Sequence, residues 1–263
     1  MTLLFESPQL LDERQSTKFF NYIFIISQCF GIFAVFGVAV WMGAFEDGGF
    51  SWSENPSKQF NYHPTFMVVA IIFLQGESIL VYRVFRNERK KFTKLLHMST
   101  HSIALLLVLI SLKAVWDSHD LHRDSNGELN PLPNLISLHS WIGISSVIFY
   151  FIQFGAGFLT FFWPSLSQDL RRAILPFHQL GGLLILFFCT ITALMGISEY
   201  SAWHHICWTV EKQFCGRQLI SNLLGFSLIG FSFCIFLLIA NPRWKRRPLP
   251  EEECLNSLIV DEE

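Results

Sequence analysis

Four histidines recur along the chain at nearly constant intervals, each close to one end of a long apolar segment. They are His63, His101, His139 and His178, and the steps between them are 38, 38 and 39 residues. Imidazole is a common ligand for transition metals. Non-haem metals usually require carboxylate or thiolate partners as well, and these four positions have none nearby. The spacing therefore predicts a metal cofactor that is bound by imidazoles alone.

Six apolar segments position these histidines. Each is long enough to cross the hydrocarbon of a bilayer, which takes about 20 residues of helix. The chain is 51% hydrophobic and 15% charged, which is typical of an integral membrane protein in the lipid bilayer. We expect an all-α membrane protein that forms a single bundle. The predicted transmembrane helices span residues 19–43, 61–83, 97–116, 138–162, 177–199 and 219–240.

The order of the helices pairs the histidines. If successive helices run in opposite directions, histidines near helix starts alternate between the two leaflets. His63 and His139 then share one depth, and His101 and His178 share the other. Each pair can bind one haem iron from both sides, which predicts a four-helix core (helices 2–5) holding two haems. Bis-imidazole ligation leaves no open coordination position and so suits electron transfer rather than oxygen binding.

A second histidine complicates the inner pair. His97 and His101 lie on one helical face, so their spacing alone does not say which of them is the ligand. His101 keeps the 38-residue step, and on that ground it is assigned to the metal. His97 is given a flanking or substrate-facing role.

Basic residues set the orientation, because lysine and arginine gather on cytoplasmic loops. Both termini and two loops are rich in them, which predicts that both termini are cytosolic and that His101 and His178 form the inner pair. The net charge of −2 hides this uneven distribution of basic residues. We interpret the distribution as a sign of membrane topology and not of nucleic-acid binding. The predicted inner side holds 14 of the 19 basic residues: Arg14, Lys18, Arg83, Arg86, Arg89, Lys90, Lys91, Lys94, Arg171, Arg172, Arg243, Lys245, Arg246 and Arg247.

The alternative function is a haem-free proton or solute transporter that uses the membrane histidines as a relay. Such a relay needs acids that bridge the midplane, and Asp, Glu and Lys are absent from the middle of the predicted helices. Glu77 lies about 9 Å from the Arg83 end of its helix, where we interpret it as structural. Four histidines at two matched depths favour the haem interpretation.

The last extracytoplasmic loop holds two cysteines and several polar aromatics. Cys207 and Cys215 could be joined in an oxidising lumen, but sequence does not reveal connectivity, so this disulfide stays open. The roles of His204 and His205 also stay open.

Several short motifs together resemble the eukaryotic cytochrome b561 family. The resemblance runs from about residue 48 to residue 247. The motifs are FNYHP at 60–64, FLQG at 73–76, VYR at 81–83, KLLH at 94–97 followed by His101, SLHSW at 137–141 and TALMG at 192–196.

The resemblance implies a dimeric six-helix protein with two b haems that takes electrons from cytosolic ascorbate. It delivers them to monodehydroascorbate or ferric chelates across the membrane. The implied haem ligands are His63 with His139 outside and His101 with His178 inside. The implied ascorbate site is Arg83, Lys94 and Arg172, cationic groups that suit an anionic donor. The implied acceptor site is Trp116, His119 and Trp203.

The chain departs from the family pattern in the loop at 117–134, which is longer than usual, so acceptor specificity does not transfer. We divide the chain into a cytosolic N-terminal tail (1–18), a six-helix domain (19–247) and an acidic cytosolic tail (248–263). The motif ECLNSLI at 253–259 resembles an acidic dileucine signal with one residue too many. An endosomal, lysosomal or secretory vesicle membrane and the plasma membrane are the expected locations.

Overall fold

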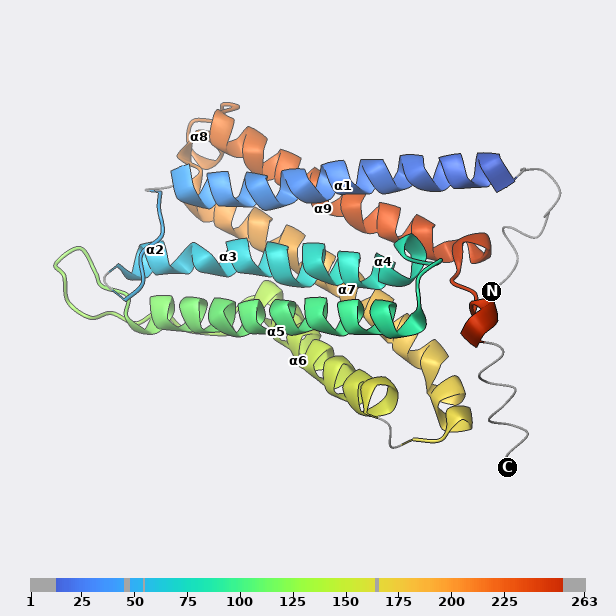
Figure 1. Ribbon diagram of the computed structural model, residues 1–263. Helices are drawn as coiled ribbons and strands as arrows, with labels where there is room; N and C mark the ends of the chain where they lie inside the picture. The colour runs from blue at the N-terminus through green and yellow to red at the C-terminus, as the bar shows by residue number, and fades with distance from the viewer. Residues whose placement is uncertain (1–12, 45–47, 54, 164–165, 253–263) are drawn as a thin grey trace.

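Among the residues that the computed structural model describes, six helices are long and apolar enough to cross a membrane, which confirms the all-α membrane class (Figure 1). The structure describes residues 13–44, 48–53, 55–163 and 166–252. The helices are α1 (Glu13–Ala44), α2 (Pro56–Phe60), α3 (Tyr62–Met67), α4 (Gln75–Val84), α5 (Lys90–Asp120), α6 (Leu138–Gly157), α7 (Gln168–His204), α8 (Ile206–Thr209) and α9 (Gly216–Ala240).

Two π-helical segments and one short 3₁₀ turn complete these helices. The segment Val68–Leu74 joins α3 to α4, so that Pro56–Val84 forms the second span. The segment Phe158–Phe162 extends α6, and the 3₁₀ turn Pro242–Trp244 follows α9. A π-turn adds a residue to the helical repeat and changes the face on which the following side chains lie.

Each predicted transmembrane segment lies inside an observed helix, and several helices extend well beyond it. The clearest case is α7, which begins at Gln168 rather than at residue 177. Hydropathy marks only the part of a helix that faces hydrocarbon, whereas backbone hydrogen bonds continue the helix into the polar interface. Pro176 therefore lies inside α7, where its missing donor leaves one carbonyl near the helix start without its usual partner.

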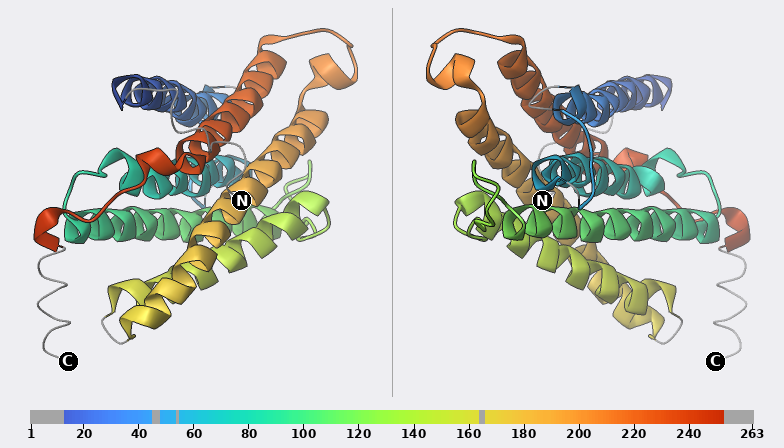
Figure 2. Two further views of the ribbon diagram at one scale, coloured as in Figure 1. Left: turned by 90° about the vertical axis from the view of Figure 1, so that its right-hand side faces the viewer. Right: turned by 90° about the vertical axis from the view of Figure 1, so that its left-hand side faces the viewer.

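The helices form two groups. Helices α1 and α9 pack along each other and bury Trp41, Met42, Leu228 and Phe231. The second group consists of spans two to five, in which α3 and α4 pack against α5, and α6 packs against α7. Figure 2 shows α6 and α7 running together at a steep angle to α5. These four spans carry all the histidines predicted to bind metal.

The bundle has two ends, which we call outer and inner. The outer end is where α5 ends and α6 begins, and the inner end is where α4 ends and α5 begins (Figure 1). At the inner end, the indole nitrogen of Trp244 donates a hydrogen bond of 3.0 Å to Ser16 Oγ, which joins the end of α9 to the start of α1. The motif at 253–259 lies outside the described residues.

Candidate functional site

The outer histidine pair consists of His63 on α3 and His139 on α6. Their ring centroids lie 6.3 Å apart, and their planes are almost perpendicular at 87°. Two imidazoles that each bind one metal at about 2 Å would hold their ring centroids about 6 Å apart. The outer pair therefore has the separation that bis-imidazole ligation requires.

Hydrogen bonds at Nδ1 orient both outer rings. His139 Nδ1 lies 2.8 Å from the carbonyl oxygen of Thr192, which can only accept, so Nδ1 carries the proton. His63 Nδ1 lies 3.1 Å from Ser111 Oγ, and that hydroxyl donates to the carbonyl of His63 at 3.0 Å. The Ser111 oxygen is thus the acceptor for His63. Both imidazoles therefore keep the Nε2 lone pair for a metal, because metal-binding histidines usually donate their other ring N–H to a neighbouring acceptor.

At the inner end, the histidine that lies at the same ring separation from His178 is His97 rather than His101. The ring centroids of His97 on α5 and His178 on α7 lie 6.3 Å apart at 70°. His97 Nδ1 lies 2.8 Å from the carbonyl oxygen of Ser78, which fixes its proton on Nδ1. His101 Nδ1 instead lies 2.9 Å from the hydroxyl of Tyr150, which can donate or accept. The geometry at this end thus departs from the prediction based on the 38-residue step.

Two glycines give room to the rings of His139 and His178. A Cβ added at Gly196 would lie 2.7 Å from Cε1 of His139, and one added at Gly157 would lie 2.7 Å from Cε1 of His178. On each helix the histidine precedes the glycine by 18 residues, which is five helical turns and therefore the same face. Antiparallel packing of α6 and α7 then sets each histidine against the glycine of the other helix. This repeat is visible in the sequence, but the predictions did not use it.

A cavity of about 420 Å³ lies beside the outer histidines and is lined both by residues of the outer end and by residues deeper in the bundle. His63 and His139 line it together with Trp116, His119 and Trp203. The structure therefore brings the predicted acceptor residues together with the outer histidine pair. The remaining lining is mostly apolar. It includes Ile71 from the π-helical segment Val68–Leu74, Val147 from α6 and Leu224 from α9.

These residues fit a haem at both levels. Three observations suit a planar tetrapyrrole between two histidines: the ring separation, the Nδ1 hydrogen bonds of His63, His139 and His97, and the glycine opposite one imidazole of each pair. Among the described residues there is no group of three or more His, Cys, Asp or Glu that could hold a metal ion alone. The donor set thus suits a metal whose equatorial ligands come from a cofactor.

The predicted inner cations lie at helix ends. Arg83 donates to the carbonyls of Ile239 at 2.7 Å and Asn241 at 3.1 Å, at the end of α9. Lys94 Nζ donates to the carbonyl of Phe161 at 2.7 Å, and Arg172 forms an exposed ion pair of 3.4 Å with Asp169. Arg83 and Lys94 therefore both stabilise helix C-termini, where cations are favoured.

The residues whose roles were open lie at the end of α7 and in the loop that follows it. Cys207 and Cys215 are joined by a disulfide. His204 stacks on Tyr200 with ring centroids 4.0 Å apart, and His205 is fully buried with Nδ1 2.9 Å from Gln218 Oε1. The disulfide is therefore present, and both histidines contact neighbouring residues at the outer end.

Residues 62–204, which carry both histidine pairs, match the family described as eukaryotic cytochrome b561. The chain belongs to the eukaryotic cytochrome b561 family. The family description names a b-type cytochrome, which implies that haem b is the cofactor. Family membership also disfavours the haem-free transporter.

The relatives of this cytochrome b561 chain extend the similarity over nearly its whole length. A Caenorhabditis elegans homologue of the transmembrane ascorbate-dependent reductase CYB561 is 52% identical and covers 98% of this chain and 97% of its own. The mouse transmembrane ascorbate-dependent reductase CYB561 is 36% identical over 89% of each chain. The mouse plasma membrane ascorbate-dependent reductase CYBRD1 is 30% identical and covers 82% of this chain and 71% of its own.

Proposed function

We propose that this cytochrome b561 carries single electrons across a membrane, from cytosolic ascorbate to an extracytoplasmic acceptor. The observation that carries the proposal is that two pairs of histidines lie at the two ends of one four-helix group. In each pair the ring centroids are 6.3 Å apart. When bound there, haem supplies reversible one-electron chemistry without an open position for oxygen. The residues around it hold the iron, orient it and bind the substrates.

The proposed ligands are His63 with His139 at the outer haem, and His97 with His178 at the inner haem. His97 replaces the predicted His101 for two reasons. Its ring lies at the bridging distance from His178, and its Nδ1 faces a carbonyl that leaves Nε2 for the metal. His101 lies 4.6 Å from His97 between ring centroids and contacts Tyr150, so we assign it to the support of the inner pair.

Ascorbate is the proposed donor. The names of the mouse relatives describe ascorbate-dependent reductases, and ascorbate is an anion that cations attract. Lys94 uses one of its three N–H groups on Phe161 and keeps two for an anion. Arg172 is exposed, with 76% of its side chain accessible. Arg83 is held by the end of α9, so we expect it to contribute charge rather than direct contact.

The proposed acceptor is monodehydroascorbate or a ferric chelate. It would bind in the outer cavity, where Trp116, His119 and Trp203 lie beside the outer histidines. Aromatic walls with one imidazole suit a small planar or polar molecule.

The proposed orientation places both termini in the cytosol, because the inner end carries most of the basic residues. The homodimer implied by the family resemblance stays a prediction, which crosslinking of the protein in lipid nanodiscs would test. The proposed locations are an endosomal, lysosomal or secretory vesicle membrane, or the plasma membrane.

Vesicles that contain the protein and are loaded with ascorbate test this function. We expect a low-spin b-haem spectrum that ascorbate reduces, and reduction of an acceptor on the opposite side. Lys94→Ala should slow reduction by ascorbate and leave the spectrum unchanged, while Lys91→Ala, an exposed lysine on the same helix, should change neither. Absence of a low-spin b-haem band in the purified protein would overturn the proposal, and unchanged kinetics in Lys94→Ala would refute the donor site.

A further inference from the structure

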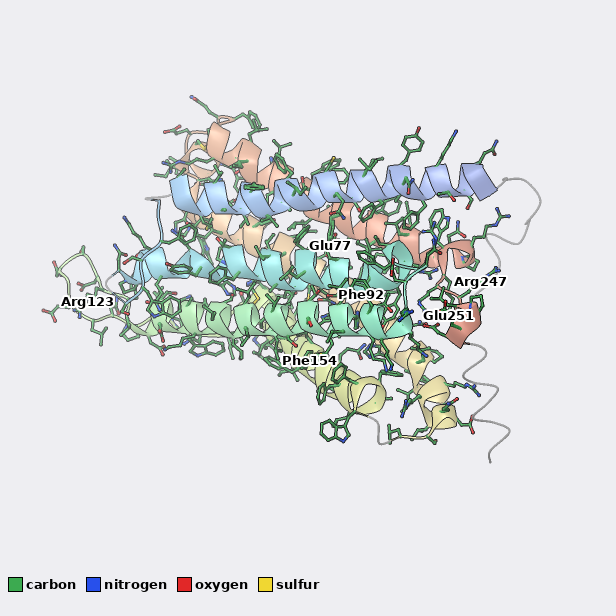
Figure 3. The ribbon with its side chains drawn as sticks, in the orientation of Figure 1. Glu77, Phe92, Arg123, Phe154, Arg247 and Glu251 are labelled. Atoms are coloured by element: carbon green, nitrogen blue, oxygen red, sulfur yellow. A yellow bond between two sulfur atoms is a disulfide. The ribbon has the colours of Figure 1, made fainter. Side chains whose placement is uncertain are left out.

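A small hairpin closes the outer end between α5 and α6. Its two arms are joined by backbone hydrogen bonds from Leu132 to His119 at 3.0 Å and from Asn130 to His122 at 2.8 Å, and by an antiparallel bridge between Arg123 and Leu129. Figure 3 shows Arg123 in this hairpin, beyond the end of α5. These contacts return the chain to the helix it has just left.

The tip of the hairpin is a defined turn. Asp124 Oδ1 accepts from the amides of Asn126 at 2.8 Å and Glu128 at 3.0 Å, and Gly127 has a φ of +81°, which glycine adopts without strain. The ordered turn fixes where the second arm lies. That arm brings Asn134 back to His119.

A chain of two hydrogen bonds joins His119, Asn134 and Asp120. His119 Nδ1 lies 2.8 Å from Asn134 Oδ1, and Asn134 Nδ2 donates to Asp120 Oδ1 at 3.1 Å. A carboxylate only accepts hydrogen bonds, so the amide nitrogen of Asn134 must face Asp120 and its oxygen must face His119. The proton of a neutral His119 therefore lies on Nδ1. Its lone pair lies on Nε2.

His119 and Asn134 both line the outer cavity, together with His63 and His139. With Nδ1 engaged by Asn134, Nε2 is the His119 nitrogen that can bind a ligand there. As a lone-pair acceptor it complements a hydroxyl donor on that ligand.

We propose that Asp120 and Asn134 are positioning residues that hold His119 as a hydrogen-bond acceptor, so that the outer cavity selects small acceptors that carry hydroxyl groups. This inference rests on the proposed function and names the acceptor class within it. Monodehydroascorbate carries hydroxyls on its side chain. A ferric chelate built only from carboxylates and amines, such as ferric nitrilotriacetate, carries none.

The first test compares kcat/KM for the two acceptors in ascorbate-loaded vesicles. Asn134→Leu removes both hydrogen bonds and should lower kcat/KM for monodehydroascorbate about tenfold, as loss of a ligand hydrogen bond does. The value for ferric nitrilotriacetate should change less than about twofold. Asn130→Leu, an exposed asparagine on the same hairpin, is the matched control and should match the wild type for both acceptors.

The double variant Asp120→Asn/Asn134→Asp exchanges the two side chains and keeps the orientation of His119. The new carboxylate at position 134 would accept from Nδ1 of His119, and its other oxygen would accept from the new amide at position 120. We expect this exchange to restore wild-type preference, which a merely structural role for the two positions would not predict. Equal losses for both acceptors in Asn134→Leu, or no loss for either, would overturn the inference.

An independent readout is the tautomer of His119. Nitrogen NMR of ¹⁵N-histidine protein in its reduced state, assigned with His119→Gln, should show His119 protonated on Nδ1 in the wild type and on a mixture of nitrogens in Asn134→Leu. Protonation on Nε2 in the wild type would refute the inference. If ascorbate does not reduce the wild-type haems, the proposed function is wrong. The NMR result still tests the orientation of His119 in that case, because it does not depend on electron transfer from ascorbate.

Discussion

The imidazole of His97 lies 6.3 Å from that of His178, the same separation that divides His63 from His139. The two pairs differ in the angle between their ring planes, which is 70° for His97 with His178 and 87° for His63 with His139. Two cofactors of the same kind require the same ring separation at both ends, because the lengths of the metal–nitrogen bonds determine that separation. The alternative inner ligand, His101, is one helical turn away.

Substitution of the two inner histidines separates these assignments. His97→Ala should lose the inner haem, because its metal loses one of two protein ligands. His101→Gln should retain both haems. The haem-to-protein ratio and the low-spin optical spectrum measure the outcome. Loss of a haem in His101→Gln with retention in His97→Ala would restore the assignment based on the 38-residue step.

The glycines opposite the histidines predict a steric effect. Gly157→Ala should displace the His178 ring and weaken haem binding at the inner level, because the new methyl would lie 2.7 Å from Cε1. Gly155→Ala is the control, since an added Cβ there meets nothing within 4 Å. That variant should bind haem normally and gain about 0.5–1 kcal/mol of helix stability. Haem titration and thermal unfolding distinguish the two, and equal haem affinity in both variants would contradict the packing role of Gly157.

A polar contact within the bundle links α1 to α4. Gln28 Nε2 donates a hydrogen bond of 2.7 Å to Glu77 Oε1, and Figure 3 shows Glu77 between these helices. Gln28→Leu should lower the free energy of unfolding, and a double-mutant cycle with Glu77→Leu should give a coupling of about 0.6–1.7 kcal/mol, the range for hydrogen bonds between membrane helices. Cys29→Ala, at an exposed neighbouring position, should have little effect. A coupling near zero would show that the two side chains act independently.

The carboxylate of Glu252 should make the stability of the inner end depend on pH in acid. Burial alone would raise its pKa, but hydrogen bonds from Arg246 and from the amides of Lys90 and Leu249 lower the pKa of Glu252 to about 2. Because this pKa lies below the ordinary value of 4.5, Glu252 stabilises the folded chain fully above about pH 4.5. The contribution is lost as the pH falls from about 4.5 to about 2, and it is constant across the neutral range.

Hydrogen exchange at the Lys90 amide measures this effect, because that amide donates to Glu252 Oε1 at 2.7 Å. Its protection, corrected for intrinsic exchange, should be constant from about pH 5 to 7 and fall below about pH 4. Glu252→Gln should lower the protection at neutral pH about tenfold. Glu251→Gln is the matched control, because its 4.0 Å contact with Arg89 is exposed and contributes little. Unchanged protection in Glu252→Gln would show that the carboxylate does not hold this end.

Much of this protein could be predicted from one-dimensional patterns. Apolar segments of sufficient length define the spans because a bilayer imposes that length, and basic residues predict the orientation for an equally general reason. The histidine spacing predicted that His63 pairs with His139 and that the histidines lie at two depths. Successive antiparallel helices place regularly spaced residues alternately at one depth and at the other. His63 and His139 lie 6.3 Å apart between ring centroids, and their role as ligands stays a prediction.

The inner pair and the outer loop depended on three-dimensional contacts. His97 and His101 share a helical face, so only the approach of α7 decides which ring lies opposite His178. The contact between His119 and Asn134 joins residues that are 15 apart in sequence, and it exists only because the hairpin folds back on α5. The sequence by itself determined the membrane helices and the histidine levels, since both follow from periodicity and length. Tertiary structure alone decided which ring faces His178 and how His119 is oriented, because each depends on a partner from another element.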